Sequence, residues 1–211
     1  LNLAVGAMLL IAVLILWRRE LAAIITLFAA QGLALGTTVG LIALHEGSIE
    51  LVVVTALVLV LRAGILPWLL RRTLAAAGPN RRETRPLMNV VASLLAAAGL
   101  TLLAYAVAQP LVALDPSPAT HAIPAALAVA LIGFLILVTR RLALSQLVGF
   151  LLLDNGITAV GILTTAGVGL VVELGISMDV LLVVIVLQVL KSRIRAAFGA
   201  TDLDELRELH D

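Results

Sequence analysis

Two oppositely charged side chains fall in stretches of sequence too apolar to solvate them. Asp154 lies at the middle of an apolar run over residues 142–166, with Asn155 beside it, and Arg62 lies near the centre of another run over residues 48–70. An ionised side chain at the centre of a bilayer costs at least about 2.5–3.5 kcal/mol on insertion scales. A chain that keeps such charges must give them a partner or water. Both residues are therefore candidates for a proton or ion site.

The helix expected to carry Arg62 cannot neutralise it. Glu50 is 12 residues away, which is about 18 Å along a helix axis, and it lies on a different face. The counter-ion must come from another helix, either Asp154 or an acid of a partner subunit. Such a buried pair can be purely structural, or its fixed positive charge can control proton binding by the acid. Gly64 and Pro67 follow Arg62, so we expect the helix to bend just below the charge.

The face of Asp154 continues in small and polar residues. Thr158, Gly161 and Thr165 follow it at helical spacing. A stripe of this kind suits either a close helix contact or a file of water molecules. A carboxylate that only accepts hydrogen bonds from a neighbouring helix and never titrates would also be compatible with it.

Other polar positions extend or flank this candidate site. Asp179 lies inside the expected seventh span and could be the next ion-binding residue along a path. The sequence also fits the alternative that Asp179 is an interfacial acid at the outer end of that helix. For Glu50 we favour the interfacial location. Lys191 lies 12 residues after Asp179, and Arg62 lies the same distance after Glu50. The candidate proton or ion pathway thus comprises Asp154, Asp179, Arg62, Asn155, Gln31, Thr158, Glu50 and Lys191.

The elements that must position these residues are membrane-spanning helices. Hydrophobic residues make up 62% of the chain and charged residues 13%, and the mean hydropathy is +1.18. Apolar runs of about 20 residues match a hydrocarbon core of about 30 Å. We expect an all-α membrane protein with about seven transmembrane helices. They cover residues 2–17, 21–44, 48–70, 87–111, 122–139, 142–166 and 171–194.

The basic residues all fall on one side of this seven-span reading, if Arg62, inside the third span, is counted with the arginines that follow that span. They are Arg18, Arg19, Arg62, Arg71, Arg72, Arg81, Arg82, Arg85, Arg140, Arg141, Lys191, Arg193, Arg195 and Arg207. Cytoplasmic loops carry such an excess of Lys and Arg. The sequence therefore predicts an N-terminus outside, a C-terminus in the cytoplasm and a location in the cytoplasmic membrane of a prokaryote.

The two halves of the chain resemble each other. Arg18-Arg19 precedes the second span as Arg140-Arg141 precedes the sixth, and Gln31 stands where the second half has Asp154. Low-complexity apolar sequence can produce such coincidences, but we favour two parallel three-helix repeats, spans 1–3 and 5–7, joined by span 4. The first repeat would then lack a titratable group at Gln31. The expected units are residues 1–76, a linker with the fourth span at 77–121, residues 122–198, and an acidic cytoplasmic tail at 199–211.

Proline-rich and cysteine-free sequence sets further limits. Pro110, Pro116, Pro118 and Pro124 predict an irregular outer stretch from Gln109 to Pro124. With no cysteine, the chain has no disulfide, thiolate metal site or iron–sulfur ligand. Phosphate loops, cofactor fingerprints and catalytic triads are missing from the sequence, which indicates no catalytic centre of its own. A net charge of +1 indicates no nucleic-acid partner.

The C-terminal third resembles a known family. The motifs are Gly149-Phe150-Leu151-Leu152-Leu153-Asp154-Asn155-Gly156, Ser177-Met178-Asp179, Leu187-Gln188-Val189-Leu190-Lys191 and an Asp-Leu-Asp-Glu-Leu tail. They are similar to the K-type subunit of respiratory complex I and to the C subunit of multisubunit cation/proton antiporters. In length and layout the whole chain looks closer to component E of hydrogenase-4 and formate-hydrogenlyase-type complexes.

This resemblance implies a non-catalytic membrane-arm subunit beside antiporter-like membrane subunits. A peripheral redox arm, with a nickel–iron centre and iron–sulfur clusters in partner chains, would drive proton or sodium movement. The chain departs from the family at two positions. The acid of the K-type subunit lies about one turn before Asn155, where this chain has Leu151. Family members tend to carry a Lys within the third span, where this chain has Arg62. Arginine does not deprotonate, so Arg62 suits a fixed charge better than a relay. Two alternatives stay open: a cation/proton antiporter subunit without a redox arm, and a packing subunit with no part in ion transport.

Overall fold

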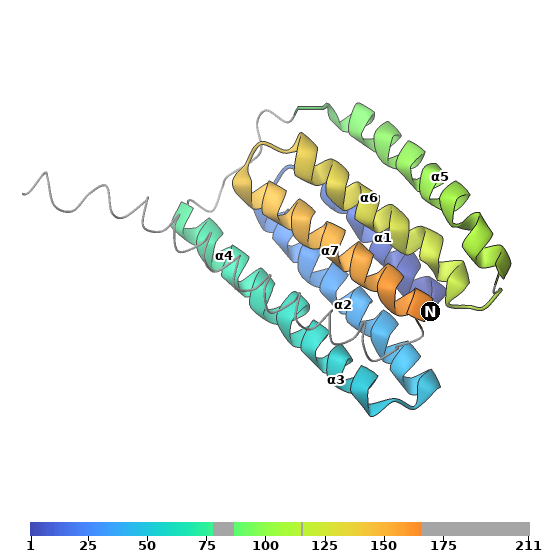
Figure 1. Cartoon of the computed structure of the whole chain (residues 1–211). Helices are drawn as coiled ribbons and strands as arrows, with labels where there is room; N and C mark the ends of the chain where they lie inside the picture. Colours follow the sequence, from blue (N-terminus) through green and yellow to red (C-terminus); the bar gives the residue numbers. More distant parts are fainter. Residues whose placement is uncertain (78–86, 115, 166–211) are drawn as a thin grey trace, which may run out of the picture.

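Helices account for nearly all of the described chain. The computed structural model describes residues 1–77, 87–114 and 116–165, and no strand occurs in these ranges. Figure 1 shows the helices in chain order. They are α1 (Asn2–Trp17), α2 (Leu21–Glu46), α3 (Ile49–Val58), the π-helix η1 (Leu59–Ile65), α4 (Leu66–Ala77), α5 (Val90–Leu114), the short 3-10 helix η2 (Thr120–Ala122), α6 (Ile123–Thr139) and α7 (Ala143–Thr165).

The expected membrane class agrees with these helices. In the described part of the chain, five helical stretches are long and apolar enough to cross a membrane. They are Leu21–Glu46, Ile49–Ala75, Val90–Leu114, Thr120–Thr139 and Ala143–Thr164. The first predicted span, residues 2–17, is the shorter apolar helix α1. The predicted seventh span at 171–194 lies outside the described residues, together with Asp179 and Lys191.

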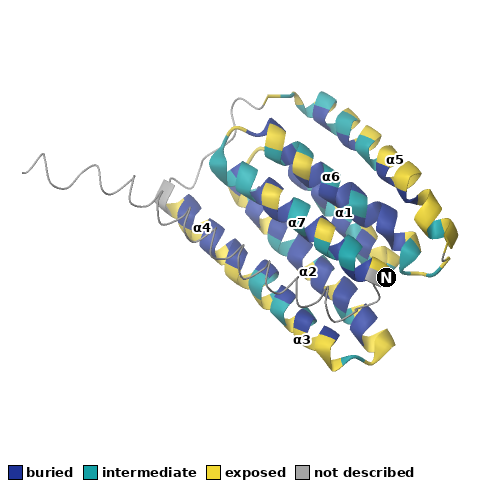
Figure 2. Cartoon of the chain, in the orientation of Figure 1, coloured by how far each residue is buried: buried dark blue, intermediate teal, exposed yellow. Residues whose placement is uncertain are grey.

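The helices form a bundle with a central group and two flanks (Figure 1). In the centre α1 packs on α2 and α6, and α7 packs on α6 and α2. Helix α5 lies against α6 and α1 at one edge, and the continuous run α3–η1–α4 lies against α2 at the opposite edge. Figure 2 shows the burial that results: buried residues concentrate on the central helices, whereas α5 is mostly exposed. An apolar helix with so little protein contact needs lipid or another chain around it.

Helices at corresponding places in the two halves of the chain run in the same direction. Helices α1 and α6 run one way and α2 and α7 run the other, as parallel repeats require (Figure 1). The short connections after α1 and α6 both carry an arginine pair, and the α2–α3 turn is made by Gly47 at a φ of 64°. Only glycine adopts such a left-handed conformation without strain.

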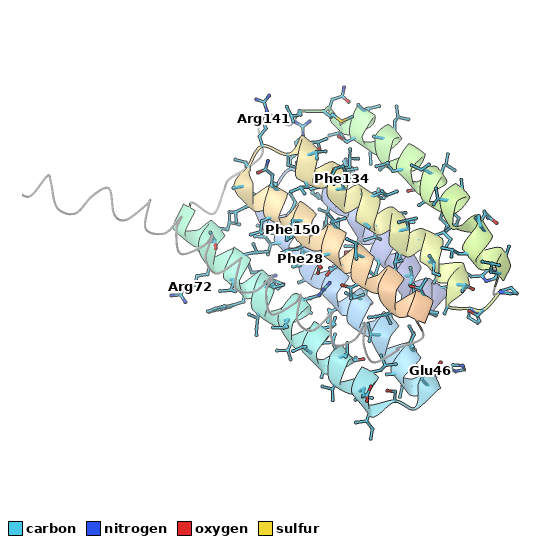
Figure 3. The ribbon with its side chains drawn as sticks, in the orientation of Figure 1. Phe28, Glu46, Arg72, Phe134, Arg141 and Phe150 are labelled. Carbon is cyan, nitrogen blue, oxygen red and sulfur yellow. The ribbon has the colours of Figure 1, made fainter. Side chains whose placement is uncertain are left out.

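One end of the bundle, which we call the basic end, collects six of the arginines. They are Arg18, Arg19, Arg71, Arg72, Arg140 and Arg141. Figure 3 labels Arg72 and Arg141 at this end and Glu46 at the opposite end. Two of these arginines lie over tryptophan rings, Arg18 at 5.6 Å from the centre of Trp17 and Arg72 at 5.5 Å from the centre of Trp68. Tryptophan concentrates at membrane–water boundaries, so these pairs mark the depth of the basic end.

Helices α6 and α7 approach each other closely because glycines face the contact. A Cβ added at Gly149 would lie 2.6 Å from the backbone N of Leu137, and one added at Gly156 would lie 2.6 Å from the Cα of Ala130. A Cβ at Gly133 would collide with the backbone of Leu153. Small residues allow this contact between apolar helices, where van der Waals packing and not hydrophobic burial drives association.

The expected irregular stretch from Gln109 to Pro124 is wrong at both of its ends. Helix α5 continues through Pro110 to Leu114, and Pro124 lies in the first turn of α6. A proline disturbs only the helical turn that precedes it. The helix can continue for a few residues after the proline where neighbouring groups provide hydrogen bonds for the freed backbone carbonyls. At the start of a helix proline loses nothing, since its missing N–H has no partner there.

Arg140 joins the two halves at the basic end. Its side chain is 6% exposed, and its guanidinium donates to the backbone oxygens of Leu16 at 2.5 Å and Arg18 at 3.0 Å. These carbonyls belong to the end of α1, where helical partners run out. The equivalent Arg18 of the first half instead lies over Trp17. The arginine pairs of the two halves therefore have different contacts.

We expect Arg140→Gln to destabilise the chain by about 2–4 kcal/mol, because hydrogen bonds from a charged donor are worth about 1.5–3 kcal/mol and the carbonyls stay buried. The measurement is the unfolding midpoint of the purified chain in detergent. Arg72→Gln is the matched control, since an exposed cation–π contact is worth about 0.5–1 kcal/mol. Equal losses in both variants would contradict the contact assigned to Arg140.

Candidate functional site

The backbone departs from a regular α-helix where it carries Arg62. Residues Leu59–Ile65 form a π-helix, and the N–H of Leu66 donates to the oxygen of Leu61 five residues back. Pro67 follows at once, and its ring would clash with the carbonyl four residues earlier in an α-helix. The wider π turn accommodates the proline, so the expected bend near Gly64 and Pro67 takes the form of a π-helical segment. Single π turns of this kind occur often at functional sites.

Helix α2 brings its backbone against this segment. A Cβ added at Gly32 would lie 2.7 Å from the carbonyl carbon and oxygen of Arg62. Gly36 and Gly40 repeat the pattern one and two turns later, where added Cβ atoms would lie 2.7 Å from Leu59 Cγ and 3.2 Å from Thr55 Cγ2. The glycines thus seat the α3–η1 helix on α2 and fix the position from which the Arg62 side chain extends.

The Arg62 side chain reaches across to α7 and contacts three polar residues there. One guanidinium nitrogen, Nη2, lies 2.5 Å from Oδ2 of Asp154 and donates to the hydroxyl of Thr158 at 3.0 Å. The other, Nη1, donates to Oδ1 of Asn155. The expected alternative of an acid on a partner subunit is not needed, since Asp154 is the counter-ion.

Burial makes this a charge pair with little access to water. The Arg62 side chain is 2% exposed and that of Asp154 is 15% exposed. Both lie near the middle of helices long enough to cross a bilayer. A buried pair gains Coulomb energy but loses hydration, so its net stabilisation is small while the loss of either partner is expensive. Asp154 is the more exposed member of the pair.

Gln31 contacts α1, and no hydrogen bond joins it to the ion pair among the described residues. Its side chain is fully buried, and Nε2 donates to the backbone oxygen of Met8 at 3.4 Å. It therefore bonds α1, whereas Asp154 at the corresponding place in the second half bonds α3–η1–α4. The two positions, which we expected to correspond, therefore differ in the helix they contact.

The remaining predicted residues fall into two groups. Glu50 is exposed in the first turn of α3. The hydroxyl of Ser48 caps that helix by accepting from the N–H of Leu51. Asp179, Lys191 and the side chain of Thr165 lie outside the described residues. The structure therefore brings together Arg62, Asp154, Asn155 and Thr158 from the predicted set, and it leaves Glu50 apart.

Sequence reasoning missed the polar surroundings of Met8. Thr38 is buried, and its hydroxyl lies 3.8 Å from the Met8 sulfur while donating to the oxygen of Ala34 at 2.9 Å. The seven-residue spacing of Gln31 and Thr38, which places both on one face of a helix, was the available signal. It indicates a polar strip inside the first helix pair.

A metal site has no support in the described ranges. Within them, no group of three or more His, Cys, Asp or Glu side chains gathers as metal ligands would. His45 and His121 lie exposed near the end of the bundle opposite the basic end. At the Arg62–Asp154 pair, a carboxylate lies beside a fixed positive charge.

Comparison with known proteins places the chain beside one relative of matching length. No protein-family model matches the chain, and no solved structure matches it at a significant level. A Mycobacterium tuberculosis protein described as Uncharacterized protein Rv0085 is 50% identical over 210 residues, which cover 100% of this chain and 96% of the relative. Identity of this extent over two chains of nearly equal length means that they share one fold and one origin. The chain belongs to the protein family of Mycobacterium tuberculosis Rv0085.

Proposed function

We propose that the chain is a non-catalytic membrane-arm subunit of an energy-converting, complex I-related hydrogenase-type complex. In this role its intramembrane acids contribute to redox-driven translocation of protons or sodium ions. The observation that carries the proposal is the Arg62–Asp154 pair, joined by Asn155 and Thr158, in the middle of apolar helices. The sequence resemblance of residues 140–210 supplies the class of complex.

Ion translocation would depend on the asymmetry of the pair. Arg62 keeps its charge under all physiological conditions, so only Asp154 can change charge by taking up a proton. When Asp154 is neutral, the guanidinium loses its strongest partner but keeps acceptors on Asn155 and Thr158. These two residues hold Arg62 in place between the charged and neutral states. A change in the partner subunits that alters hydration around Asp154 would then drive proton uptake or release.

The arrangement of charges supports a location and an orientation. The basic end gathers six arginines and two arginine–tryptophan pairs, so it would face the cytoplasm in the cytoplasmic membrane of a prokaryote. The largely exposed helix α5 leaves a long apolar surface for lipid or for antiporter-like subunits. A nickel–iron centre and iron–sulfur clusters would belong to partner chains, because this chain has no cysteine to ligate them.

A second candidate, a subunit of a cation/proton antiporter without a redox arm, rests on the same ion pair. The two candidates differ in the chains that accompany this one. The experiment is purification of the tagged protein in a mild detergent, followed by mass spectrometry of the co-purifying chains. We expect antiporter-like subunits together with a metal–sulfur redox arm. Antiporter-like subunits alone would favour the second candidate, and a lone monomer would contradict both.

The third reading, a packing subunit, is tested by neutralising both charges together. In Arg62→Gln/Asp154→Asn no charge is left unpaired, so we expect the complex to assemble at close to its normal level. Its ion transport should fall by about 100-fold, which is the contribution typical of a positioned proton-transfer group. The measurement is ion uptake by inverted membrane vesicles, normalised to assembled complex. Glu50→Gln, at the exposed helix end, is the control that should transport normally. Normal transport by the doubly neutral variant would establish a structural role for the pair.

A further inference from the structure

A small cavity lies at the basic end, between the start of α5 and the ends of α1 and α6. Its volume is about 10 Å³, it is partly open to the outside, and Arg19, Ser93, Thr139 and Arg140 supply its polar lining. The N–H of Leu87 donates to the oxygen of Thr139 at 3.1 Å, which holds the chain before α5 beside the end of α6. A volume of this size takes about one oxygen atom as large as a water molecule. The cavity therefore suits a single oxygen of a larger polar group that approaches from outside.

Positive charge dominates the lining of this cavity. Arg19 is exposed, and it makes no hydrogen bond or ion pair with the described part of the chain. Arg140 is buried and is held in place by its hydrogen bonds to the carbonyls at the end of α1. Among the described residues, no acidic side chain lines the cavity. The N-terminus of α5, which begins beside the cavity at Val90, adds a partial positive charge. These groups together favour an anionic occupant.

The hydroxyl of Ser93 supplies a hydrogen-bond donor for this occupant. Ser93 is 7% exposed, and its hydroxyl has no hydrogen bond with any described residue. Serine and threonine inside helices often donate to the carbonyl four residues back. Thr101 does so on the same helix, and Thr139 does so at the end of α6. A buried donor without an acceptor is costly, so Ser93 is expected to find its acceptor in the cavity.

We propose that this cavity binds the phosphate of an anionic phospholipid headgroup. One phosphate oxygen enters the cavity and accepts from the Ser93 hydroxyl, while Arg19 and Arg140 supply the positive charge. Arginine suits this task because its planar guanidinium presents several N–H donors to phosphate oxygens. Basic pockets between membrane helices bind anionic headgroups by the same means. The lipid site does not depend on the ion transport proposed above.

The depth of the cavity favours a lipid over a free phosphate ion. Trp17, whose ring lies under Arg18, marks the membrane–water boundary next to Arg19. The exposed apolar side of α5 begins at the same level, with Val91 and Leu95 at 66% and 68% exposed (Figure 2). A phosphate held here leaves its acyl chains beside this apolar surface. A zwitterionic headgroup would bring its own cation towards Arg19, so a headgroup with net negative charge is preferred.

Native mass spectrometry of the full-length chain in detergent, titrated with phosphatidylglycerol, tests this site. We expect the first phosphatidylglycerol to bind more tightly than phosphatidylcholine, whose headgroup carries a cation. Ser93→Ala should weaken this first binding step about tenfold, as expected for the loss of a hydrogen bond to a charged group. Because the Ser93 hydroxyl has no partner among the described residues, this variant should fold normally. Arg19→Gln should weaken the same step about fivefold, the usual effect of one basic residue near an anionic headgroup.

Arg72→Gln is the matched control, because Arg72 is exposed at the same end but does not line the cavity. It should bind phosphatidylglycerol as tightly as the unaltered chain does. Equal losses in Arg19→Gln and Arg72→Gln would mean general attraction to the basic end and would overturn the site, as would normal binding by Ser93→Ala. Equal affinity for the two lipids would also overturn it. Complete displacement of the lipid by inorganic phosphate would overturn the lipid as the ligand. A failure of the proposed function would show separately, as normal transport in Arg62→Gln/Asp154→Asn.

Discussion

Asp154→Leu is expected to destabilise the chain by about 3–5 kcal/mol, the usual cost of leaving one charge of a buried pair without its partner. Arg62 is 2% exposed and sits on a helix seated against the α2 backbone, so it cannot move to water. Arg62→Met should be costly for the same reason, since it leaves Asp154 without its counter-ion. The measurement is the free energy of unfolding of the purified chain in detergent or bicelles.

The double variant Arg62→Met/Asp154→Leu separates charge from packing. Replacing a buried ion pair with apolar residues of similar volume is often neutral or stabilising by about 1–4 kcal/mol. We therefore expect the double variant to unfold within about 1 kcal/mol of the unaltered chain, or to be more stable. The two single changes would then be strongly non-additive. Glu50→Leu, at an exposed helix end, controls for loss of an acid and should change stability little. Additive losses in the double variant would mean that the two side chains do not interact.

The second large effect concerns the contact between α6 and α7. Gly156→Ala places a methyl group 2.6 Å from the Cα of Ala130, and backbone atoms cannot rotate away as a flexible side chain does. Overpacking of this kind costs about 1–3 kcal/mol, and we expect the upper part of that range. Because Asn155 and Asp154 immediately precede Gly156, the shift of α7 should also disturb the contacts to Arg62. Thermal unfolding of the variant in detergent measures the first effect.

Gly99→Ala is the matched control for this change. An added Cβ at Gly99, on the exposed helix α5, has no atom within 4 Å. Alanine is the better helix former by about 0.5–1 kcal/mol, so this variant should be slightly stabilised. Opposite signs for the same substitution at Gly156 and Gly99 would locate the effect in the helix contact. A tolerated alanine at Gly156 would mean that α6 and α7 are farther apart than described.

Much of the fold follows from hydropathy because each helix must satisfy its own backbone in an apolar medium. The predicted spans at 21–44 and 142–166 differ from α2 and α7 by no more than two residues at either end. The continuation of α5 through Pro110 was not predictable in this way. Whether a proline ends a helix depends on the neighbouring groups that compensate its missing N–H, and the sequence of one helix does not contain them.

The sequence predicted that Arg62 needs a counter-ion from another helix, and it offered Asp154 or an acid of a partner subunit; the structure shows that Asp154 is this counter-ion. The hydrogen bond of Arg62 to Thr158 also follows from the polar stripe after Asp154. The π-helix around Arg62 and the seating of its carbonyl on Gly32 could not be foreseen. Both result from packing between separate helices, whereas periodicity describes one helix at a time. The cross-link from Arg140 to the end of α1 was missed for the same reason.

The π-helical segment Leu59–Ile65 gives this helix one residue more than a regular α-helix of the same height needs. Loss of a single residue from the segment would restore the regular repeat and turn everything before it by about 100° relative to everything after it. Glu50 and Ser48 would then face different neighbours while Trp68 and Arg72 kept theirs. In relatives of this chain, a one-residue alignment gap between Leu59 and Ile65 is therefore expected to coincide with a change at Arg62 or Asp154.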